Sequence, residues 1–312
     1  MTPRSLQPDV TCARTPDEDG FGLPELMVSL VIVLVIFGVM TSGMAQMSNA
    51  QRTIWNRTQM HGGVRGATEL LQQEVGQAGR ITLPAAVSTT AATTLGVNTV
   101  PLTSVASLYV GEKLVVGPAN DEETVTLTAI DSVAGTITAY FGNDHATNAP
   151  VRVVGGFATG IVPPTQANGS TGSVLKLYGD VNGDGQMVYV EYTCDTTAGN
   201  LYRNMMSITA ATKPAVTASN ILLTSLIANP GNAACFTYQT TTAGTQTYVT
   251  NVAITLSVRT QNLDPVTKQY QNETKALLNV SPRNVGLVWQ LGSLGLTNRI
   301  QPTPPSVLNL LL

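Results

Sequence analysis

The chain is poor in charged, aromatic and histidine residues. Of its 312 residues, 11% are charged and 5% are aromatic, and the two histidines are His61 and His145. A net charge of −3, without a basic stripe, does not indicate a nucleic-acid-binding protein. The histidines lie far apart, and the sequence contains no Gly-x-Ser-x-Gly elbow, phosphate-binding Gly-Lys-Ser/Thr loop or His-rich metal motif. The sequence therefore predicts a protein that is not an enzyme and that requires no cofactor.

Threonine, valine, glycine and asparagine are abundant instead, in a pattern typical of extracellular β-structure. A Thr/Ala-rich connector over 85–100 precedes short alternating segments over 101–155, which predict a small antiparallel barrel or sandwich. Such a module either binds a ligand or simply enlarges the head, and we favour the second interpretation. After a loop over 156–172, further strand-like segments predict a β-rich head over 170–284, followed by a C-terminal tail, 285–312.

A long apolar segment near the N-terminus predicts a membrane-spanning helix. Between positions 26 and 40 only Ser29 and Gly38 are not strongly apolar, and the run up to Met47 reaches the ~20 residues that a membrane helix needs. Over 48–80 apolar residues recur at spacings of three, four and seven, so we expect the helix to continue as an amphipathic one. Glycines at 62, 63 and 66 predict a bend or a loosened turn. The expected fold class is α+β: a long N-terminal transmembrane and amphipathic helix, then an antiparallel β-rich head with a small inserted β-module.

Three fates are compatible with this segment. It is a secretory signal peptide cleaved after Ala45, an uncleaved signal anchor, or a precursor cleaved on the cytoplasmic side between Gly20 and Phe21. Glu25 favours the third fate. A carboxylate in a membrane segment costs roughly 2.5–3.5 kcal/mol and marks a function with a partner, whereas a signal peptide gains nothing from it.

Gly20 and Phe21, followed by Leu23, Glu25, Leu26 and the apolar run, resemble the processing motif of type IV prepilins and pseudopilins. The resemblance implies that prepilin peptidase removes a leader, 1–20, and methylates the new amine of Phe21. It also implies that Glu25, then the fifth residue, neutralises the Phe21 amine of a neighbouring subunit as helices pack in a filament. Two opposite charges in lipid are tolerable when they are paired.

Two residues of the segment depart from the family pattern. Gly22 and Pro24 replace the commoner Thr and Ile, and Pro24 falls in the first helical turn, where a missing N–H costs little. The flanking charges do not by themselves support the expected orientation, which therefore rests on the resemblance. The resemblance implies that 21–47 spans the bacterial inner membrane and that the head is periplasmic. The implied partners are prepilin peptidase, other pilin subunits and the assembly machinery of a type IV pilus or a type II secretion pseudopilus.

The head also resembles that of larger minor pilins. The similar features are a Tyr-Gly-Asp turn, the "LYRN" strand, the long "VAITLSVRT" strand, the "DPVTKQY" turn and a closing strand that ends in "SPRN". This resemblance implies a minor structural subunit, at a filament tip or in priming. One alternative is a pilus-associated adhesin whose head binds a surface, DNA or a partner protein, with 101–155 as the binding module. The less favoured alternative is a membrane-tethered enzyme, which would show activity in a soluble fragment that starts near residue 80. The choice between pilus and secretion pseudopilus stays open.

The three cysteines divide between the two ends of the chain. Cys12 precedes the apolar segment, whereas Cys194 and Cys235 lie in the expected head. In an oxidising compartment these two form one disulfide, or they are two buried free thiols. Sequence spacing leaves both alternatives open.

The segment "DVNGDGQMVYVE", 180–191, matches the calcium-loop pattern Asp-x-Asn-x-Asp-Gly…Glu. Its candidate Ca²⁺ ligands are Asp180, Asn182, Asp184, the Gln186 carbonyl and Glu191. The flanking segments alternate like strands, however, and a strand would carry Glu191 with it and away from the loop. The alternative is a β-hairpin whose Asn-Gly-Asp-Gly turn uses residues that tolerate a positive φ.

Overall fold

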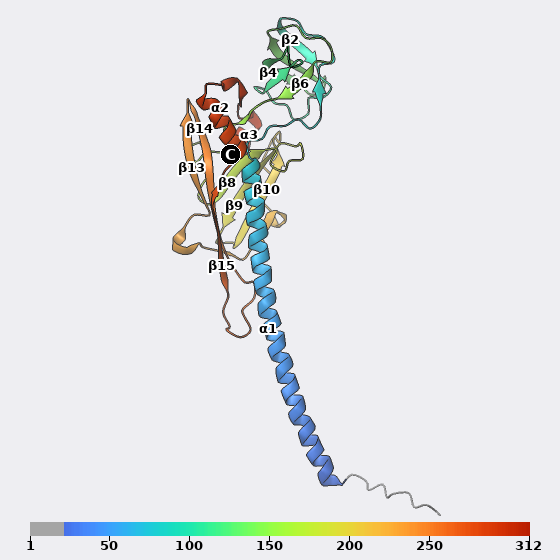
Figure 1. The fold of residues 1–312 in the computed structure, drawn as a ribbon, viewed down its shortest axis with the longest axis vertical. Helices are drawn as coiled ribbons and strands as arrows, with labels where there is room; N and C mark the ends of the chain where they lie inside the picture. Colours follow the sequence, from blue (N-terminus) through green and yellow to red (C-terminus); the bar gives the residue numbers. More distant parts are fainter. Residues whose placement is uncertain (1–21) are drawn as a thin grey trace, which may run out of the picture. The chain divides into compact units, whose positions relative to one another are not determined.

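A computed structural model of the protein describes residues 22–312. The chain forms two compact units, one ending at Thr53 and the other comprising Ile54–Leu312. Helix α1 (Leu23–Gln77) contributes to both units, and all the strands belong to the second (Figure 1). The predicted fold class is confirmed: a long N-terminal apolar helix precedes an antiparallel β-rich domain.

The first unit is the apolar part of α1. Its large apolar side chains are 53–75% exposed, since no other described segment of this unit covers them. Among the described residues, α1 is the one helix that is long and apolar enough to cross a membrane. Exposed apolar surface on this scale is typical of a segment that contacts a membrane or another protein.

In the second unit, the rest of α1 buries one face against the head. The predicted amphipathic pattern is confirmed from Met60 onward. Ile54, which the same spacing places on the apolar face, is 64% exposed. The predicted loosened turn is not seen, because α1 stays helical through all three glycines. Gly63 allows a close approach to the head, since a Cβ there would lie 3.2 Å from Leu223 Cδ1. The buried apolar residues follow helical spacing: Met60, Val64, Ala67, Leu71 and Val75.

Two four-stranded antiparallel sheets form the body of the head, and the apolar face of α1 packs with both in a single core (Figure 1). The first sheet has the order β11-β10-β9-β8; in the second, β14 pairs with β12, β13 and β15. Along β9 and β14, alternating Val, Ile, Leu and Tyr side chains are buried in this core. The strands are β8 (Val174–Gly179), β9 (Val188–Asp195), β10 (Asn200–Ser207), β11 (Ile221–Thr224), β12 (Leu226–Ile227), β13 (Phe236–Ala243), β14 (Gln246–Arg259) and β15 (Asn272–Val280).

A six-stranded antiparallel module with its own core is inserted between α1 and the first sheet. It is larger than the predicted 101–155, because the segment expected to be a connector supplies β1 and β2. Backbone hydrogen bonds from Thr90 N to Pro101 O and from Thr103 N to Ser88 O join the two ends of the sheet into a small barrel. The strands run in the order β1-β6-β3-β4-β5-β2: β1 (Val87–Ser88), β2 (Gly96–Pro101), β3 (Lys113–Val116), β4 (Glu123–Asp131), β5 (Thr136–Phe141) and β6 (Pro150–Val153).

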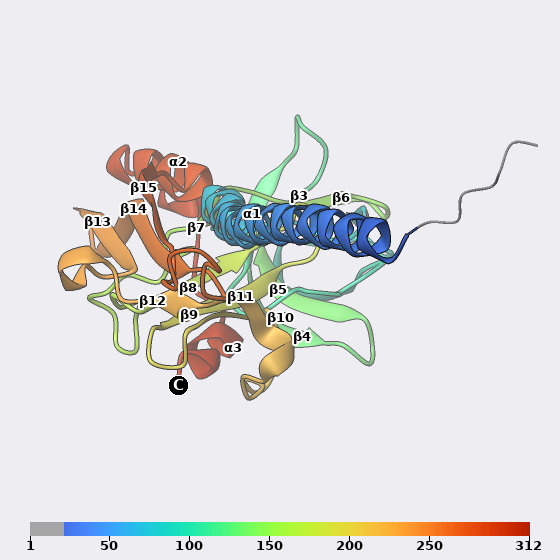
Figure 2. The same ribbon diagram turned by 90° about the horizontal axis from the view of Figure 1, so that it is seen from below.

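The loop after the module and the C-terminal tail are integral parts of the head. The expected loop contains β7 (Gly156–Phe157), which pairs with β16 (Ile300–Gln301). In the tail, α2 (Arg283–Ser293) lies beside β13 and β14, and α3 (Pro305–Leu310) lies on another side of the head (Figure 2). Val307, Leu310 and Leu311 are buried there with Tyr178 and Tyr189. The apolar end of the chain is therefore core.

Candidate functional site

The first candidate site is the N-terminal end of α1. Glu25 Oε2 accepts a hydrogen bond of 3.1 Å from Gly22 N, and Ser29 Oγ donates to Glu25 O at 2.8 Å. The carboxylate thus caps its own helix at the positive end of the helix dipole. Pro24 lies in the first turn, where its missing N–H leaves no bond unmade. Gly20 and Phe21, the predicted cleavage pair, lie outside the described residues.

Residues 180–186 form the turn between β8 and β9, which is exposed from Asn182 to Asp184. Asp180 is buried; its Oδ1 accepts from Asp184 N at 3.1 Å, and its Oδ2 lies 3.5 Å from Arg80 Nε. Asp184 Oδ1 in turn accepts from Gln186 N at 2.9 Å. Gly183 and Gly185 both have positive φ, as the hairpin alternative requires.

Glu191 is not at this turn. It lies on β9 opposite Lys176 of β8, while the turn begins where Gly179 pairs with Val188. A strand rises about 3.3 Å per residue, so Glu191 is about 10 Å along β9 from the turn. Among the described residues, no group of three or more His, Cys, Asp or Glu is placed to hold a metal ion. The predicted five-ligand calcium set is therefore not assembled in the structure, and calcium at the remaining loop oxygens stays a prediction.

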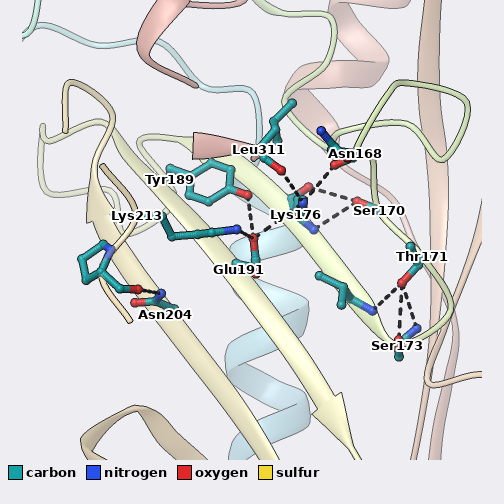
Figure 3. A network of polar contacts seen from close by, with 12 residues as sticks. Asn168, Ser170, Thr171, Ser173, Lys176, Tyr189, Glu191, Asn204, Lys213 and Leu311 are labelled. Carbon is teal, nitrogen blue, oxygen red and sulfur yellow. Dashed lines mark hydrogen bonds and ion pairs between the residues drawn. The ribbon is translucent and has the colours of Figure 1, made fainter. Parts of the chain in front are cut away.

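Glu191 belongs instead to a charged network on the first sheet (Figure 3). Its Oε2 accepts from Tyr189 Oη at 2.9 Å and from Lys213 Nζ at 3.2 Å, and it lies 3.8 Å from Lys176 Nζ. Lys176 Nζ also donates to the backbone oxygens of Asn168 and Leu311, at 2.9 and 3.1 Å. Burial lowers the pKa of Lys176. The network ties the C-terminal segment to β8 and β9.

A second charged cluster fixes α1 on the same sheet. Glu74, 1% exposed, projects from the buried face of α1 and accepts from Tyr192 Oη at 2.6 Å and from Arg203 Nε at 3.0 Å. Arg203 Nη2 also bonds Glu74 Oε1. Burial, then the charge of Glu74, raises the pKa of Tyr192. The sequence analysis did not single out this cluster. Its signal in the sequence is a carboxylate, Glu74, within the apolar stripe of a helix, whereas the ion pair with Arg203 of β10 is evident only from the tertiary structure.

The structure joins Cys194 and Cys235 in a disulfide with a Cα–Cα distance of 6.5 Å. Cys194 is on β9, and Cys235 precedes β13. The bond thus connects the two sheets of the head, 41 residues apart in sequence. Of the two open alternatives, the structure has the disulfide.

His145 has a structural environment inside the β-module. Its side chain is fully buried, and Nε2 lies 2.8 Å from Glu123 Oε1. The same carboxylate accepts from Gly142 N at 2.7 Å and from Asn143 N at 3.2 Å. Glu123 and His145 therefore hold the β5–β6 connection against β4.

No family model, no curated protein and no solved structure matches this chain. The class of protein is therefore described from the structure alone. A helix long and apolar enough to cross a membrane has a carboxylate cap at its start, and it is followed in the chain by a β-rich head with a disulfide between its sheets.

Proposed function

We propose that the chain is a minor pilin or pseudopilin. Prepilin peptidase cleaves it before Phe21 and methylates the new amine. The subunit then assembles through α1 into a type IV pilus or a type II secretion pseudopilus, at the tip or in priming. Before assembly it is a single-pass protein of the bacterial inner membrane with a periplasmic head, and it performs no catalysis.

The observation that carries the proposal is Glu25, the carboxylate in the first turn of an otherwise apolar helical segment. Among the described residues, the carboxylate is bonded to a single backbone N–H, that of Gly22. A carboxylate has two oxygens with about four acceptor sites, so Glu25 is able to accept from a partner as well as from Gly22. In lipid, the new Phe21 amine of a neighbouring subunit satisfies that capacity and removes the net charge.

The exposed apolar surface of the first unit supports the same proposal. Such a helix is stable in a bilayer before assembly, and it loses little when other apolar helices replace the lipid. The head supports it in another way: a disulfide between its sheets suits an oxidising compartment.

Mass spectrometry of the mature N-terminus, from a membrane fraction, tests the processing. We expect N-methyl-Phe21 as the first residue. A chain that starts at Gln46 is a secreted β-protein, and a chain with an intact Met1 is a tethered ectodomain; either result contradicts the proposal.

Assembly is tested separately with Glu25→Gln, which keeps the shape of the side chain and the cap to Gly22 N. We expect cleavage to continue and incorporation into filaments to be lost. Glu69→Gln is the matched control, because Glu69 lies on the same helix outside the apolar segment and pairs with Arg65. Equal incorporation of the two variants would refute the assigned role of Glu25.

One observation favours the adhesin alternative as a second candidate. The β-module has its own core, and on its outer face Val97 and Tyr140 pair across β2 and β5 while 73% and 61% exposed. Contiguous exposed apolar patches mark interaction sites, and this pair would lie within such a patch. Cells whose filaments carry Tyr140→Ser should then lose surface attachment but not filaments.

A further inference from the structure

The exposed turn between β8 and β9 contains one of the two Asn-Gly pairs of the chain, Asn182-Gly183; the other is Asn168-Gly169. An asparagine followed by glycine is the arrangement most open to spontaneous deamidation, because glycine has no side chain to hinder ring closure. We propose that Asn182 is a modification site, which converts to aspartate and isoaspartate in the folded protein, and that Asn168 is protected.

The reaction needs only water. The backbone nitrogen of Gly183 loses its proton to solvent base and attacks Cγ of Asn182. The bond between Cγ and the amide nitrogen Nδ2 breaks, ammonia leaves, and a five-membered succinimide forms. Water then opens the ring at either carbonyl, which gives aspartate or isoaspartate.

The surroundings of Asn182 permit each step. Asn182 and Gly183 are exposed, and the N–H of Gly183 makes no hydrogen bond to any described residue. The side-chain amide of Asn182 has a single weak partner in the described part of the chain, the sulfur of Met205 at 3.6 Å. A Cβ built on Gly183 would lie 3.8 Å from Arg80 Nη1, so a positively charged guanidinium lies near the residue whose nitrogen attacks.

The surroundings of Asn168 oppose the same steps. The N–H of Gly169 donates to Gln166 O at 2.9 Å, and Asn168 O accepts from Lys176 Nζ at 2.9 Å. A Cβ on Gly169 would lie 2.1 Å from Pro163 O, which shows how closely the backbone is packed there. The attacking nitrogen is therefore hydrogen-bonded and its peptide is held on both sides. The two pairs are chemically alike and differ in their tertiary setting.

Conversion changes the turn in two ways. It places a third carboxylate between Asp180 and Asp184. Arg80, the cation nearby, is already paired with Asp180. Isoaspartate also adds a methylene to the backbone of the turn that joins β8 and β9. Older protein thus carries a longer and more acidic turn than new protein.

The test is peptide mass spectrometry of the full-length protein in detergent, incubated in ¹⁸O-labelled water at neutral and mildly alkaline pH. We expect the labelled acid to accumulate at Asn182, faster at the higher pH, and not at Asn168. The same protein, reduced and unfolded in urea, should react at both positions at similar rates. No reaction at Asn182 in the folded protein, or equal reaction at the two positions, would overturn the proposal.

Isoelectric focusing of the intact protein gives an independent readout. Native protein should develop an additional band at lower pI with time. The Asn182→Gln variant should not develop it, because glutamine cyclises far more slowly. Asn168→Gln is the matched control and should develop the band at the native rate. An acidic band that persists in Asn182→Gln would place the modification elsewhere and contradict the assignment.

Discussion

The carboxyl group of Glu112 makes the stability of the head depend on pH. Glu112 is fully buried in the turn before β3, where Oε2 accepts from Tyr109 N at 3.1 Å and Oε1 has no partner among the described residues. Burial raises its pKa from 4.5 to about 8. The hydroxyl of Tyr109 also donates to Gln301 Oε1 at 3.4 Å and to Pro302 O at 3.3 Å. The turn before β3 therefore connects the β-module to the C-terminal segment.

The sign follows from proton linkage. Between pH 4.5 and 8 the folded protein keeps the proton on Glu112 and the unfolded chain does not, so the free energy of unfolding falls as the pH rises. Each pH unit costs about 1.4 kcal/mol, and the whole interval costs roughly 4–5 kcal/mol. The loss is complete above the folded-state pKa, and the stability from this group is fully present below the unfolded-state pKa.

Glu112→Gln removes the titrating group and keeps an oxygen that accepts from Tyr109 N. We expect urea unfolding of this variant to show a flatter pH profile than the native protein, with the two curves diverging by roughly 4–5 kcal/mol between acid and mildly alkaline pH. Glu122→Gln is the control, since Glu122 is a surface residue paired with Arg152, and its profile should follow the native one. Parallel profiles for native protein and Glu112→Gln would refute the reasoning.

Three further predictions concern the stability of the head, each measured by urea or thermal unfolding. Glu74→Ala leaves Arg203 without its charged partner in a largely buried site and should lower the free energy of unfolding by about 3–5 kcal/mol. The double variant Glu74→Leu with Arg203→Met should recover most of that loss; an equal loss in the single and the double variant would contradict the ion-pair assignment. Cys194→Ser opens a loop of 41 residues and should cost about 4 kcal/mol under oxidising conditions and nothing under reducing ones. Gly160→Ala should unfold the head at lower urea, because its Cβ would lie 2.2 Å from the Cα of Gly79, just after α1. Gly286→Ala in α2 meets nothing within 4 Å and should stabilise the head by up to about 1 kcal/mol; similar effects of the two alanines would refute this packing argument.

The elements with strong local patterns were predictable from the sequence. The apolar run, the amphipathic spacing of α1 and the alternating strands of the head depend on neighbours in the chain, and all of them are present in the structure. The choice of Glu25 as a candidate functional residue also followed from sequence alone, because a carboxylate is unfavourable among apolar neighbours.

Only the tertiary structure decided which residues meet. Glu191 fits a calcium pattern in sequence, but strand pairing places it opposite Lys176 and away from the turn. The expected connector, 85–100, supplies strands of the barrel, and the expected tail, 285–312, supplies a helix that packs in the core. Neither was predicted, because their partners lie far away in the sequence. The two Asn-Gly pairs are identical in sequence and differ in their hydrogen bonds and in how closely the backbone is packed around them. Local periodicity is set by the chain itself, whereas burial, charge pairing and backbone protection depend on contacts between segments distant in sequence, which a pattern of neighbouring residues does not encode.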